Sequence, residues 1–404
     1  MADYHQNGSV ATLHNLYKRD PKELERELEA FAETRKISLI LPSLYSELET
    51  DALAGIVDQL QTARYINHVV IGLDRANEKQ FAHAREFFSC LPQKHSILWN
   101  DGPALRKVHD RLEKQGLAPN EPGKGRNVWY CIGYTLACAD SDVVALHDCD
   151  IITYRKDLLT RLLYPVVNPN FPYQFCKGYY PRVADGKLNG RVTRLLVTPL
   201  LKALQITFGH SDYVEYLQGF RYPLAGEFAM RTSILPDMRI PSDWGLEIGT
   251  LSEVWRNLSR HSVCQVDLAD VYDHKHQPLS EEDASTGLSR MSTDIAKALF
   301  RKIATEGKVM SHEHFRTLKA TYYRTALDMI EMYHNDAMMN GLSIDRHKEE
   351  KAVELFAANI VVAGNTFLEN PMETPFIPNW SRVASANPGI FMDIRKAVEN
   401  GQNG

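Results

Sequence analysis

Short apolar runs alternate with stretches of helical spacing along most of this chain. Runs suited to buried strands lie at residues 37–42, 68–74, 96–99 and 142–147, and amphipathic stretches separate them. This alternation predicts an α/β fold in which a mostly parallel sheet carries helices on both faces. Pro42 closes the first run, and we expect it to end that strand because proline has no backbone N–H.

Beyond residue 150 the alternation is less regular. The pattern predicts a helix near 156–163, a strand at 171–180, a helix at 195–204 and a strand at 262–268. From about residue 281 it is helical throughout. We therefore expect three parts: an N-terminal helical arm over 1–36, an α/β domain over 37–280 and a helical C-terminal extension over 281–404, which serves in packing or oligomerisation.

An apolar stripe runs along the segment 311–341. Its residues step by three or four: Phe315, Leu318, Tyr322, Ala326, Ile330, Tyr333 and Ala337. Such a stripe packs one face of a helix onto another surface, here either the rest of the chain or a second subunit. We expect the stripe to be buried and the protein to form a homodimer.

Composition excludes several classes of function. The 404 residues carry a formal charge of -5, so the chain has no basic surplus for binding nucleic acid. No apolar run approaches the roughly 20 residues that span a bilayer, and the N-terminus has no apolar signal core, so we expect a cytoplasmic protein without a membrane partner. The six cysteines form no CxxC pair, which favours reduced, structural thiols over a zinc site.

The run at 142–147 ends in two carboxylates, Asp148 and Asp150. Open α/β sheets build their ligand sites at the carboxyl ends of parallel strands. On an extended chain, side chains two residues apart point the same way, so both acids can face one divalent cation or its bound phosphates. The alternative is an Asp-rich turn that caps the next helix.

Two segments have the composition of anion sites. Gly123-Lys124-Gly125 opens the helix before this run, where glycines let an anion approach free backbone N–H groups and Lys124 adds positive charge. Arg191 and Thr193 lie near the start of a later helix, and a guanidinium, a hydroxyl and a helix dipole together suit a phosphate. The alternatives are a plain helix N-terminus in the first case and a surface arginine beside a threonine cap in the second.

Other candidates come from the last part of the α/β region. Glu247 lies among apolar residues near a helix start, which favours a partly buried functional acid. His274 and His276 follow the predicted strand at 262–268, and a neutral imidazole there could ligate a metal ion. A single histidine is more often structural or exposed.

The order of these features resembles the nucleotide-sugar-dependent glycosyltransferases of the GT-A fold, in particular the retaining glucosyl-3-phosphoglycerate synthases and their mannosyl-transferring relatives. The combination of segments is specific, although each segment alone is not. The resemblance implies a GT-A catalytic domain over 37–280. The matching segments are Leu41-Pro-Ser-Leu-Tyr-Ser-Glu47, Pro122-Gly-Lys-Gly125 with Trp129, Asp148-Cys-Asp150, Phe175-Cys-Lys-Gly-Tyr-Tyr180, Gly190-Arg-Val-Thr193, Pro223-Leu-Ala-Gly-Glu227, Gly245-Leu-Glu-Ile-Gly249 and His274 with Pro278-Leu.

The resemblance implies roles for individual residues. Asp150 and His274 would hold a Mg²⁺ or Mn²⁺ ion on the diphosphate, and oxygen and imidazole ligands suit either ion. Glu247 would touch the transferred sugar or the acceptor hydroxyl, and with Asp150 it is the predicted catalytic pair. The predicted donor-binding residues are Pro42, Leu44, Glu47 (on ribose hydroxyls), Asp74, Gly123, Lys124, Asp148 and Cys149. The predicted acceptor-binding residues are Gly190, Arg191, Thr193, Ala225 and Gly226.

These roles predict transfer of glucose from UDP-glucose to the 2-hydroxyl of 3-phosphoglycerate with retention of configuration. No second acid stands out as a nucleophile, so attack from the leaving-group face is favoured, with the departing phosphate taking the acceptor proton. Alternatives are GDP-mannose or GDP-glucose as donor, an already glucosylated acceptor, and a nucleotide-sugar sensor without catalysis. A sugar-1-phosphate nucleotidyltransferase would need a Gly-rich loop after the first strand, and this chain has none there.

Overall fold

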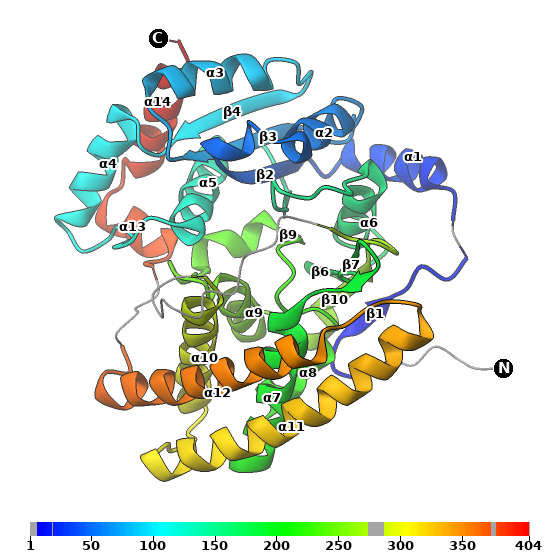
Figure 1. The fold of residues 1–404 in the computed structure, drawn as a ribbon. Helices are drawn as coiled ribbons and strands as arrows, with labels where there is room; N and C mark the ends of the chain where they lie inside the picture. Colours follow the sequence, from blue (N-terminus) through cyan, green and yellow to red (C-terminus); the bar gives the residue numbers. More distant parts are fainter. Residues whose placement is uncertain (1–5, 18, 274–286, 373–376, 404) are drawn as a thin grey trace.

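The computed structural model of the chain describes residues 6–17, 19–273, 287–372 and 377–403. Within these residues, an eight-stranded sheet lies at the centre in the order β1-β10-β6-β9-β5-β2-β3-β4 (Figure 1). Neighbouring strands are parallel except at β9, which runs antiparallel to β5 and β6. The predicted mostly parallel sheet is confirmed. The strands are β1 (Ala11–Leu13), β2 (Ile37–Leu44), β3 (His68–Asp74), β4 (Lys94–Trp99), β5 (Val143–Leu146), β6 (Phe175–Tyr179), β9 (Phe228–Arg231) and β10 (Val263–Asp267), with a separate hairpin of β7 (Val183–Ala184) and β8 (Lys187–Leu188).

Helices cover both faces of the sheet and extend beyond it at the C-terminal end of the chain (Figure 1). They are α1 (Pro21–Ala32), α2 (Asp51–Leu60), α3 (Glu78–Phe88), α4 (Pro103–Glu113), α5 (Lys124–Cys138), α6 (Lys156–Val167), α7 (Thr198–Phe208), α8 (Asp212–Gly219), α9 (Leu246–Asn257), α10 (Gly287–Thr305), α11 (His312–Met339), α12 (Arg346–Glu369), α13 (Trp380–Ala386) and α14 (Ile390–Asn403).

The alternation of side chains along each strand divides the interior into two cores. Leu39 and Leu41 of β2 pack in the core that also includes residues of α1, α2, α3 and α6, whereas Ile40 packs in the core that includes α5 and α14. The same division separates Val144 of β5 from its neighbours Val143 and Ala145. Because successive residues of a strand point to opposite faces, an apolar run without alternation is buried on both sides.

The prediction that Pro42 ends the first strand is wrong. Strand β2 continues through Pro42 to Leu44 and pairs with β3 along its length. On its other side β2 pairs with β5 only as far as Ile40. A residue without an N–H can therefore be accommodated at Pro42, because no strand of the described residues pairs with it on that side.

The N-terminal residues contribute more than the expected helix, which is α1. Residues 11–13 form β1, which pairs in parallel with β10 at the edge of the sheet. Gln265 of β10 also donates its side-chain amide to Thr12 Oγ1, at 2.9 Å. Three residues give too short a pattern to predict a strand, and the pairing partner lies far away in the sequence.

The predicted apolar stripe is buried within the chain itself. Six of its seven residues are buried along α11, while Tyr333 is half-buried. Helix α11 packs against α7 and α12, and α12 also packs against α10 (Figure 1). The expected burial is confirmed, and the stripe faces this chain rather than a second subunit, so the homodimer stays a prediction without its original support.

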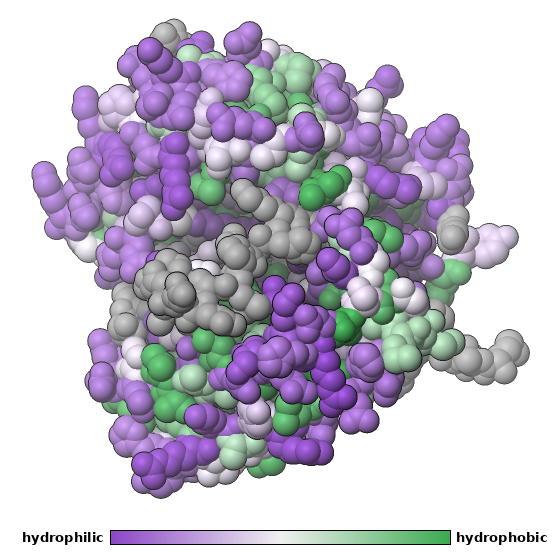
Figure 2. All heavy atoms as spheres, viewed as in Figure 1, coloured by the Kyte–Doolittle hydropathy of each residue, from purple (hydrophilic) through white to green (hydrophobic). Residues whose placement is uncertain are grey.

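Helix α12 is, by length and composition alone, apolar enough to cross a membrane. It begins with the charged residues Arg346, Lys348 and Glu349, and part of it is buried against α10 and α11. Those contacts are typical of a helix that packs against other helices in the interior of a protein. The molecular face in Figure 2 is mainly hydrophilic, with apolar side chains in small groups.

The last two helices fold back onto the α/β layers. Trp380 of α13 stacks on Trp129 of α5 with ring centroids 4.0 Å apart, and its Nε1 donates to the Trp129 carbonyl. Helix α14 packs against α4, α5 and β4. The C-terminal segment thus supports α5, the helix whose first turn reaches the candidate site.

We expect Gly133→Ala to destabilise the protein by about 1–3 kcal/mol, because the added methyl overfills this core. A Cβ at Gly133 would lie 2.2 Å from Cζ2 of Trp380 and would separate the stacked indoles. The matched control is Gly55→Ala, at an exposed position of α2 where a Cβ meets nothing within 4 Å. It should stabilise the protein by roughly 0.5–1 kcal/mol. Urea unfolding measures both, and equal midpoints for the two variants would contradict the packing described for Trp380.

Candidate active site

The predicted acids lie in the loop that follows β5. Asp148 and Asp150 are both partly exposed, whereas the side chain of Cys149 between them is buried in the core. The two carboxylates therefore face the same side of the loop, as their spacing predicts. Cys149 can face a ligand there only through its backbone.

Lys124, the first residue of α5, joins two acids of the site. Its Nζ lies 2.6 Å from Asp148 Oδ1 and 3.1 Å from Glu247 Oε1. Burial lowers the pKa of Lys124, but the two carboxylates outweigh burial and the net pKa is raised well above its ordinary value. Lys124 is therefore charged at neutral pH. It holds Asp148, a predicted residue of the donor-binding site, next to the predicted catalytic Glu247.

A second group of acids collects at the end of β2. Glu47 folds back so that its carboxylate accepts from the backbone N–H of Leu44 at 3.2 Å. Burial and the nearby Asp150 raise the pKa of Glu47 to about 7. Burial, and then Asp148, raise the pKa of Asp150, which Lys124 only partly offsets. Crowded oxygen ligands of this kind are what Mg²⁺ and Mn²⁺ prefer, and a divalent cation would relieve the repulsion, so these residues fit the predicted ion.

Asp74, a predicted donor residue, belongs to a buried polar network. Its Oδ1 accepts from Asn100 Nδ2 at 2.9 Å and from Arg126 Nη2 at 3.1 Å, and Arg126 also lies 3.6 Å from Asp101. Burial raises the pKa of Asp74, and Arg126 opposes the effect. Arg126 comes from the same helical turn as Lys124, so this network fixes the start of α5 relative to the end of β3.

The predicted acceptor segment begins with a hairpin and a π-turn. Gly190 has φ +76°, a left-handed conformation that favours glycine. The helix expected over 195–204 begins earlier, and its first turns form the π-helix η2 (Val192–Val197), in which the Thr198 N–H bonds to the Thr193 carbonyl. A π-turn inserted in a helix is frequent at functional sites. Pro199 contributes to it, because proline cannot donate within the following α-helix.

Several cationic and hydroxyl groups surround this segment. Arg191 is half-buried and, among the described residues, no hydrogen bond or ion pair engages its guanidinium. Burial raises the pKa of Tyr222, whereas Arg182 and the hydroxyl of Thr193 oppose the rise, which places these three groups together. Arg182 Nη1 donates to the Tyr222 hydroxyl at 3.3 Å. The positive charge of Arg182 also opposes, to a small extent, the rise in the pKa of Asp150 that burial and Asp148 cause. Arg182, which the sequence analysis missed, thus lies between the acceptor segment and the acids.

The remaining acceptor candidates occupy the buried turn before β9. A Cβ at Gly226 would lie 2.4 Å from Asp148 Oδ2, so glycine is required for the Asp148 carboxylate to rest on this backbone. The carbonyl of Ala225 accepts from the Nζ of buried Lys177. Burial lowers the pKa of Lys177 to about 8, with Glu247 and Glu227 opposing. Gly226, a predicted acceptor-binding residue, therefore contacts Asp148, a predicted donor-binding residue.

Glu227, also missed by the sequence analysis, organises the floor of the site. Its two carboxylate oxygens accept from the hydroxyls of Tyr180 and Tyr272, each at 2.6 Å, and the two rings stack with centroids 3.5 Å apart. Burial and Asp148 raise the pKa of Glu227, while the two tyrosines oppose this. A charged residue inside the apolar pattern at 223–230 was the available sequence signal for this network.

His274, the second predicted metal ligand, lies outside the described residues. The backbone carbonyl of Asp273, the residue just before it, accepts from the N–H of Ile152 at 2.9 Å, and the Asp273 N–H donates to Thr153 Oγ1 at 3.0 Å. These bonds tie the chain next to His274 to the loop that follows Asp150.

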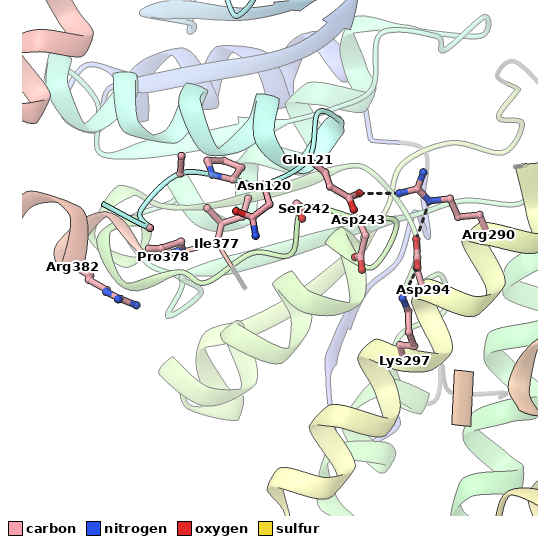
Figure 3. Close-up of a pocket in the computed structure, with 13 residues that line it drawn as sticks. Asn120, Glu121, Ser242, Asp243, Arg290, Asp294, Lys297, Ile377, Pro378 and Arg382 are labelled. Atoms are coloured by element: carbon pink, nitrogen blue, oxygen red, sulfur yellow. Dashed lines mark hydrogen bonds and ion pairs between the residues drawn. The ribbon is translucent and has the colours of Figure 1, made fainter. Parts of the chain in front are cut away.

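A cavity of about 380 Å³ lies behind the start of α5, between the α4–α5 loop, α10 and residues 377–382 (Figure 3). Four of its charged side chains pair with one another. Arg290 lies 2.9 Å from Glu121 and 3.6 Å from Asp294, and Lys297 lies 3.1 Å from Asp294. The backbone of Ser242 in its wall also touches Gly125, so the cavity lining braces the loop that carries Lys124.

Comparison with known proteins supports the family indicated by the sequence motifs. No protein-family model matches the chain. The chain is 44% identical over 399 residues to glucosyl-3-phosphoglycerate synthase of Persephonella marina, covering 99% of this chain and 98% of that protein. It is 38% identical over 400 residues to the same enzyme of Methanococcoides burtonii, covering 98% and 97%.

Solved structures establish the fold. Glucosyl-3-phosphoglycerate synthase from Mycobacterium tuberculosis, in complex with Mn²⁺, UDP-glucose and phosphoglyceric acid, matches with a TM-score of 0.53 at 23% identity, over 73% of this chain and 88% of that one. Mannosyl-3-phosphoglycerate synthase from Rubrobacter xylanophilus matches with a TM-score of 0.55 at 22% identity, over 74% and 83%. The sheet and its helices have the GT-A fold. Together with the identity along the whole chain, these findings show that the protein is a glycosyltransferase of the glucosyl-3-phosphoglycerate synthase family.

Proposed function

We propose that the enzyme transfers glucose from UDP-glucose to the 2-hydroxyl of 3-phosphoglycerate with retention of anomeric configuration. The observation that carries the proposal is the Lys124 ammonium held between Asp148 and Glu247. In this proposal the ammonium supplies a fixed positive charge for the leaving nucleoside diphosphate, next to an acid that would contact the transferred sugar. The relatives named as glucosyl-3-phosphoglycerate synthases, and the complex with UDP-glucose and phosphoglyceric acid, support this choice of substrates.

The donor would lie along the ends of β2, β3 and β5. Pro42 and Leu44 are partly exposed there, and Glu47 is held by the Leu44 N–H in a position to meet ribose hydroxyls. The structures of the Mycobacterium tuberculosis relative contain Mn²⁺ or Mg²⁺ with UDP. In this chain Asp150, with His274, would hold such an ion, whose positive charge would stabilise the leaving diphosphate.

The protein's own groups would complete the reaction. Lys124 would stabilise negative charge on the leaving phosphate, and its pairing with Glu247 would hold that carboxylate in place near the sugar. Glu247 is engaged by Lys124 and so would serve better in positioning the sugar or acceptor hydroxyl than as a nucleophile. The acceptor hydroxyl would then attack from the leaving-group face and give its proton to the departing phosphate.

The acceptor would bind at Gly190, Arg191 and Thr193, on the opposite side of the acids from the nucleoside. A phosphorylated acceptor needs dianion recognition away from the metal, because two anions would otherwise compete for one cation. Arg191 supplies a guanidinium not engaged within the described residues, and Arg182 supplies a second charge between this segment and Asp150. Ala225 and Gly226 would line the floor between donor and acceptor.

Product analysis tests the proposal. With UDP-glucose and 3-phosphoglycerate, the purified enzyme should release UDP and form one glucosylated product, which NMR should show as the α-anomer linked through the 2-hydroxyl. A β-linked product would contradict retention. Absence of any glucosylated product, with UDP-glucose bound, would instead indicate a nucleotide-sugar sensor.

Arg191→Ala should raise the KM for 3-phosphoglycerate roughly ten- to a hundredfold, because a lost charge-assisted contact costs about 1.5–3 kcal/mol of binding. The KM for UDP-glucose should barely change, since the donor lies on the other side of the acids. Glycerate without phosphate should be a poor acceptor for the wild type and no worse for the variant. Initial rates over both substrates measure this.

The control is Arg324→Ala, on the exposed side of α11, where the side chain is 77% exposed. It should leave both KM values unchanged. If Arg191→Ala instead weakens donor binding and keeps its affinity for phosphoglycerate, Arg191 serves the nucleotide and the acceptor assignment is wrong.

A further inference from the structure

Helices α11 and α12 and the turn between them contact the segment 186–197, here called the acceptor segment. The first contact is at its hairpin. The turn after α11 brings the Ser343 N–H to 2.8 Å from the Gly186 carbonyl, and the Ser343 hydroxyl donates to the same oxygen at 3.3 Å. Lys187 and Ser343 also form an isolated parallel bridge. The tip of the hairpin is thus fixed by a residue from the C-terminal extension.

The second contact is a buried ion pair. Glu349 of α12 accepts from both terminal nitrogens of Arg194, and the two side chains are only 8% and 5% exposed. The same guanidinium donates through Nε to the Asn189 carbonyl at 2.8 Å and through Nη2 to the Leu188 carbonyl at 3.3 Å. Arg194 therefore ties the backbone just before Gly190 to α12, with the ring of Tyr333 beneath its guanidinium.

The third contact completes the π-turn. Pro199 has no N–H to offer the Leu195 carbonyl four residues earlier. The hydroxyl of Tyr322, from the middle of α11, donates to that carbonyl at 2.6 Å. A buried carbonyl without a partner would be costly, so this hydroxyl stabilises the irregular turn on which Thr193 and Arg191 depend for their direction.

Arg191 and Arg194 differ in what surrounds them. Arg194 has a dedicated buried carboxylate, whereas Arg191, one turn earlier, is half-buried with its pKa lowered by burial and raised in part by the same Glu349. Because Glu349 is occupied by Arg194 through two hydrogen bonds, Arg191 stays available for an external anion. Which of the two arginines pairs with Glu349 depends on how α12 is positioned along the acceptor segment.

We propose that α11 and α12 set the position of the acceptor segment, and that Glu349 and Tyr322 are positioning residues for binding of the phosphorylated acceptor. The inference rests on the proposed function of this segment. It assigns a role in acceptor affinity to α11, α12 and the turn between them, which bond to the acceptor segment at Arg194, Leu195 and Gly186.

The test uses isosteric variants with neighbouring controls in the full-length enzyme. Glu349→Gln removes the charge, and Tyr322→Phe removes the hydroxyl. Each should raise the KM for 3-phosphoglycerate roughly three- to thirtyfold, the range of energetic coupling through packed contacts. The KM for UDP-glucose and the rate of its hydrolysis without acceptor should stay within about twofold of wild type. A shift of the acceptor segment changes acceptor binding and does not change the donor site.

The controls carry the same substitutions one residue away. Glu350→Gln affects an exposed pair with Arg346, and Tyr323→Phe affects a ring on the outer side of α11. Both should behave as wild type. Glu349→Asp, which keeps the charge, should recover part of the acceptor affinity lost in Glu349→Gln.

The outcomes separate the possible failures. Unchanged acceptor KM in both isosteric variants, or an equal rise in the KM values of donor and acceptor, would overturn the positioning role. If Glu349→Gln does not fold, Tyr322→Phe decides the question alone. A wild-type enzyme that does not saturate with 3-phosphoglycerate would overturn the proposed function instead, before any variant is compared.

Discussion

Asp150→Ala should lower turnover by about a thousandfold or more, because it removes a proposed ligand of the divalent ion and the charge stabilisation that depends on it. The carboxylate lies in a group with Asp148 and Glu47, where burial and then the crowding of negative charges raise the pKa of both Asp150 and Glu47. Removing Asp150 relieves that crowding, so the variant should fold at least as well as wild type. The loss would then belong to the chemistry and not to stability.

Initial rates with Mg²⁺ and thermal unfolding, measured on the same preparation, separate these effects. EDTA added to the wild type should reproduce the loss, and added Mg²⁺ or Mn²⁺ should restore the rate. Asp212→Ala, at an exposed position, is the control and should keep wild-type turnover. An Asp150→Ala enzyme that is fully active in EDTA would refute the metal assignment.

Lys124→Met should lower kcat by about a hundred- to a thousandfold, comparable to losing one preorganised charge at a reacting centre. The substitution removes the positive charge near the leaving phosphate. It also leaves Asp148 and Glu247 without the ammonium that lies 2.6 and 3.1 Å from them. With that positive charge gone, the two carboxylates would repel the incoming diphosphate more strongly, so donor affinity should fall as well.

A second variant separates catalysis from folding. Lys124→Met/Glu247→Gln also removes the charge of Glu247, one of the two carboxylates that Lys124 contacts. The double variant should regain part of the thermal stability lost in the single variant, while kcat stays low. Lys107→Met, on the exposed side of α4, should leave every parameter unchanged. Recovery of turnover together with stability in the double variant would mean that Lys124 only holds the fold.

Much of the site was predictable because local patterns placed its parts at the same edge of the sheet. An apolar run without alternation predicted β5, and its length placed Asp148 and Asp150 at the carboxyl end. The Gly-Lys-Gly motif predicted the start of α5, and the structure brings Lys124 to the same acids. Parallel strands end at one edge, so correct strand assignments alone bring these residues close together.

Other parts depend on pairings between distant segments, which no local pattern encodes. The Glu227 carboxylate is held by Tyr180, just after β6, and by Tyr272, from the chain after β10, so its role appears only when three segments meet. The π-turn at 192–197 depends on a hydroxyl from α11. Strand β1 forms because β10 offers an open edge to a three-residue segment. The extension of β2 beyond Pro42 likewise follows from the shortness of its neighbour β5.

The pairing of a UDP-glucose donor with a phosphorylated three-carbon acceptor can be tested by a matrix of initial rates. Initial rates would be measured with Mg²⁺ for UDP-glucose, GDP-glucose and GDP-mannose, each with 3-phosphoglycerate, glycerate or no acceptor. We expect the highest rate for UDP-glucose with 3-phosphoglycerate, and little nucleotide release when the acceptor or its phosphate is missing. A higher rate with GDP-mannose, or UDP release that does not depend on 3-phosphoglycerate, would contradict it.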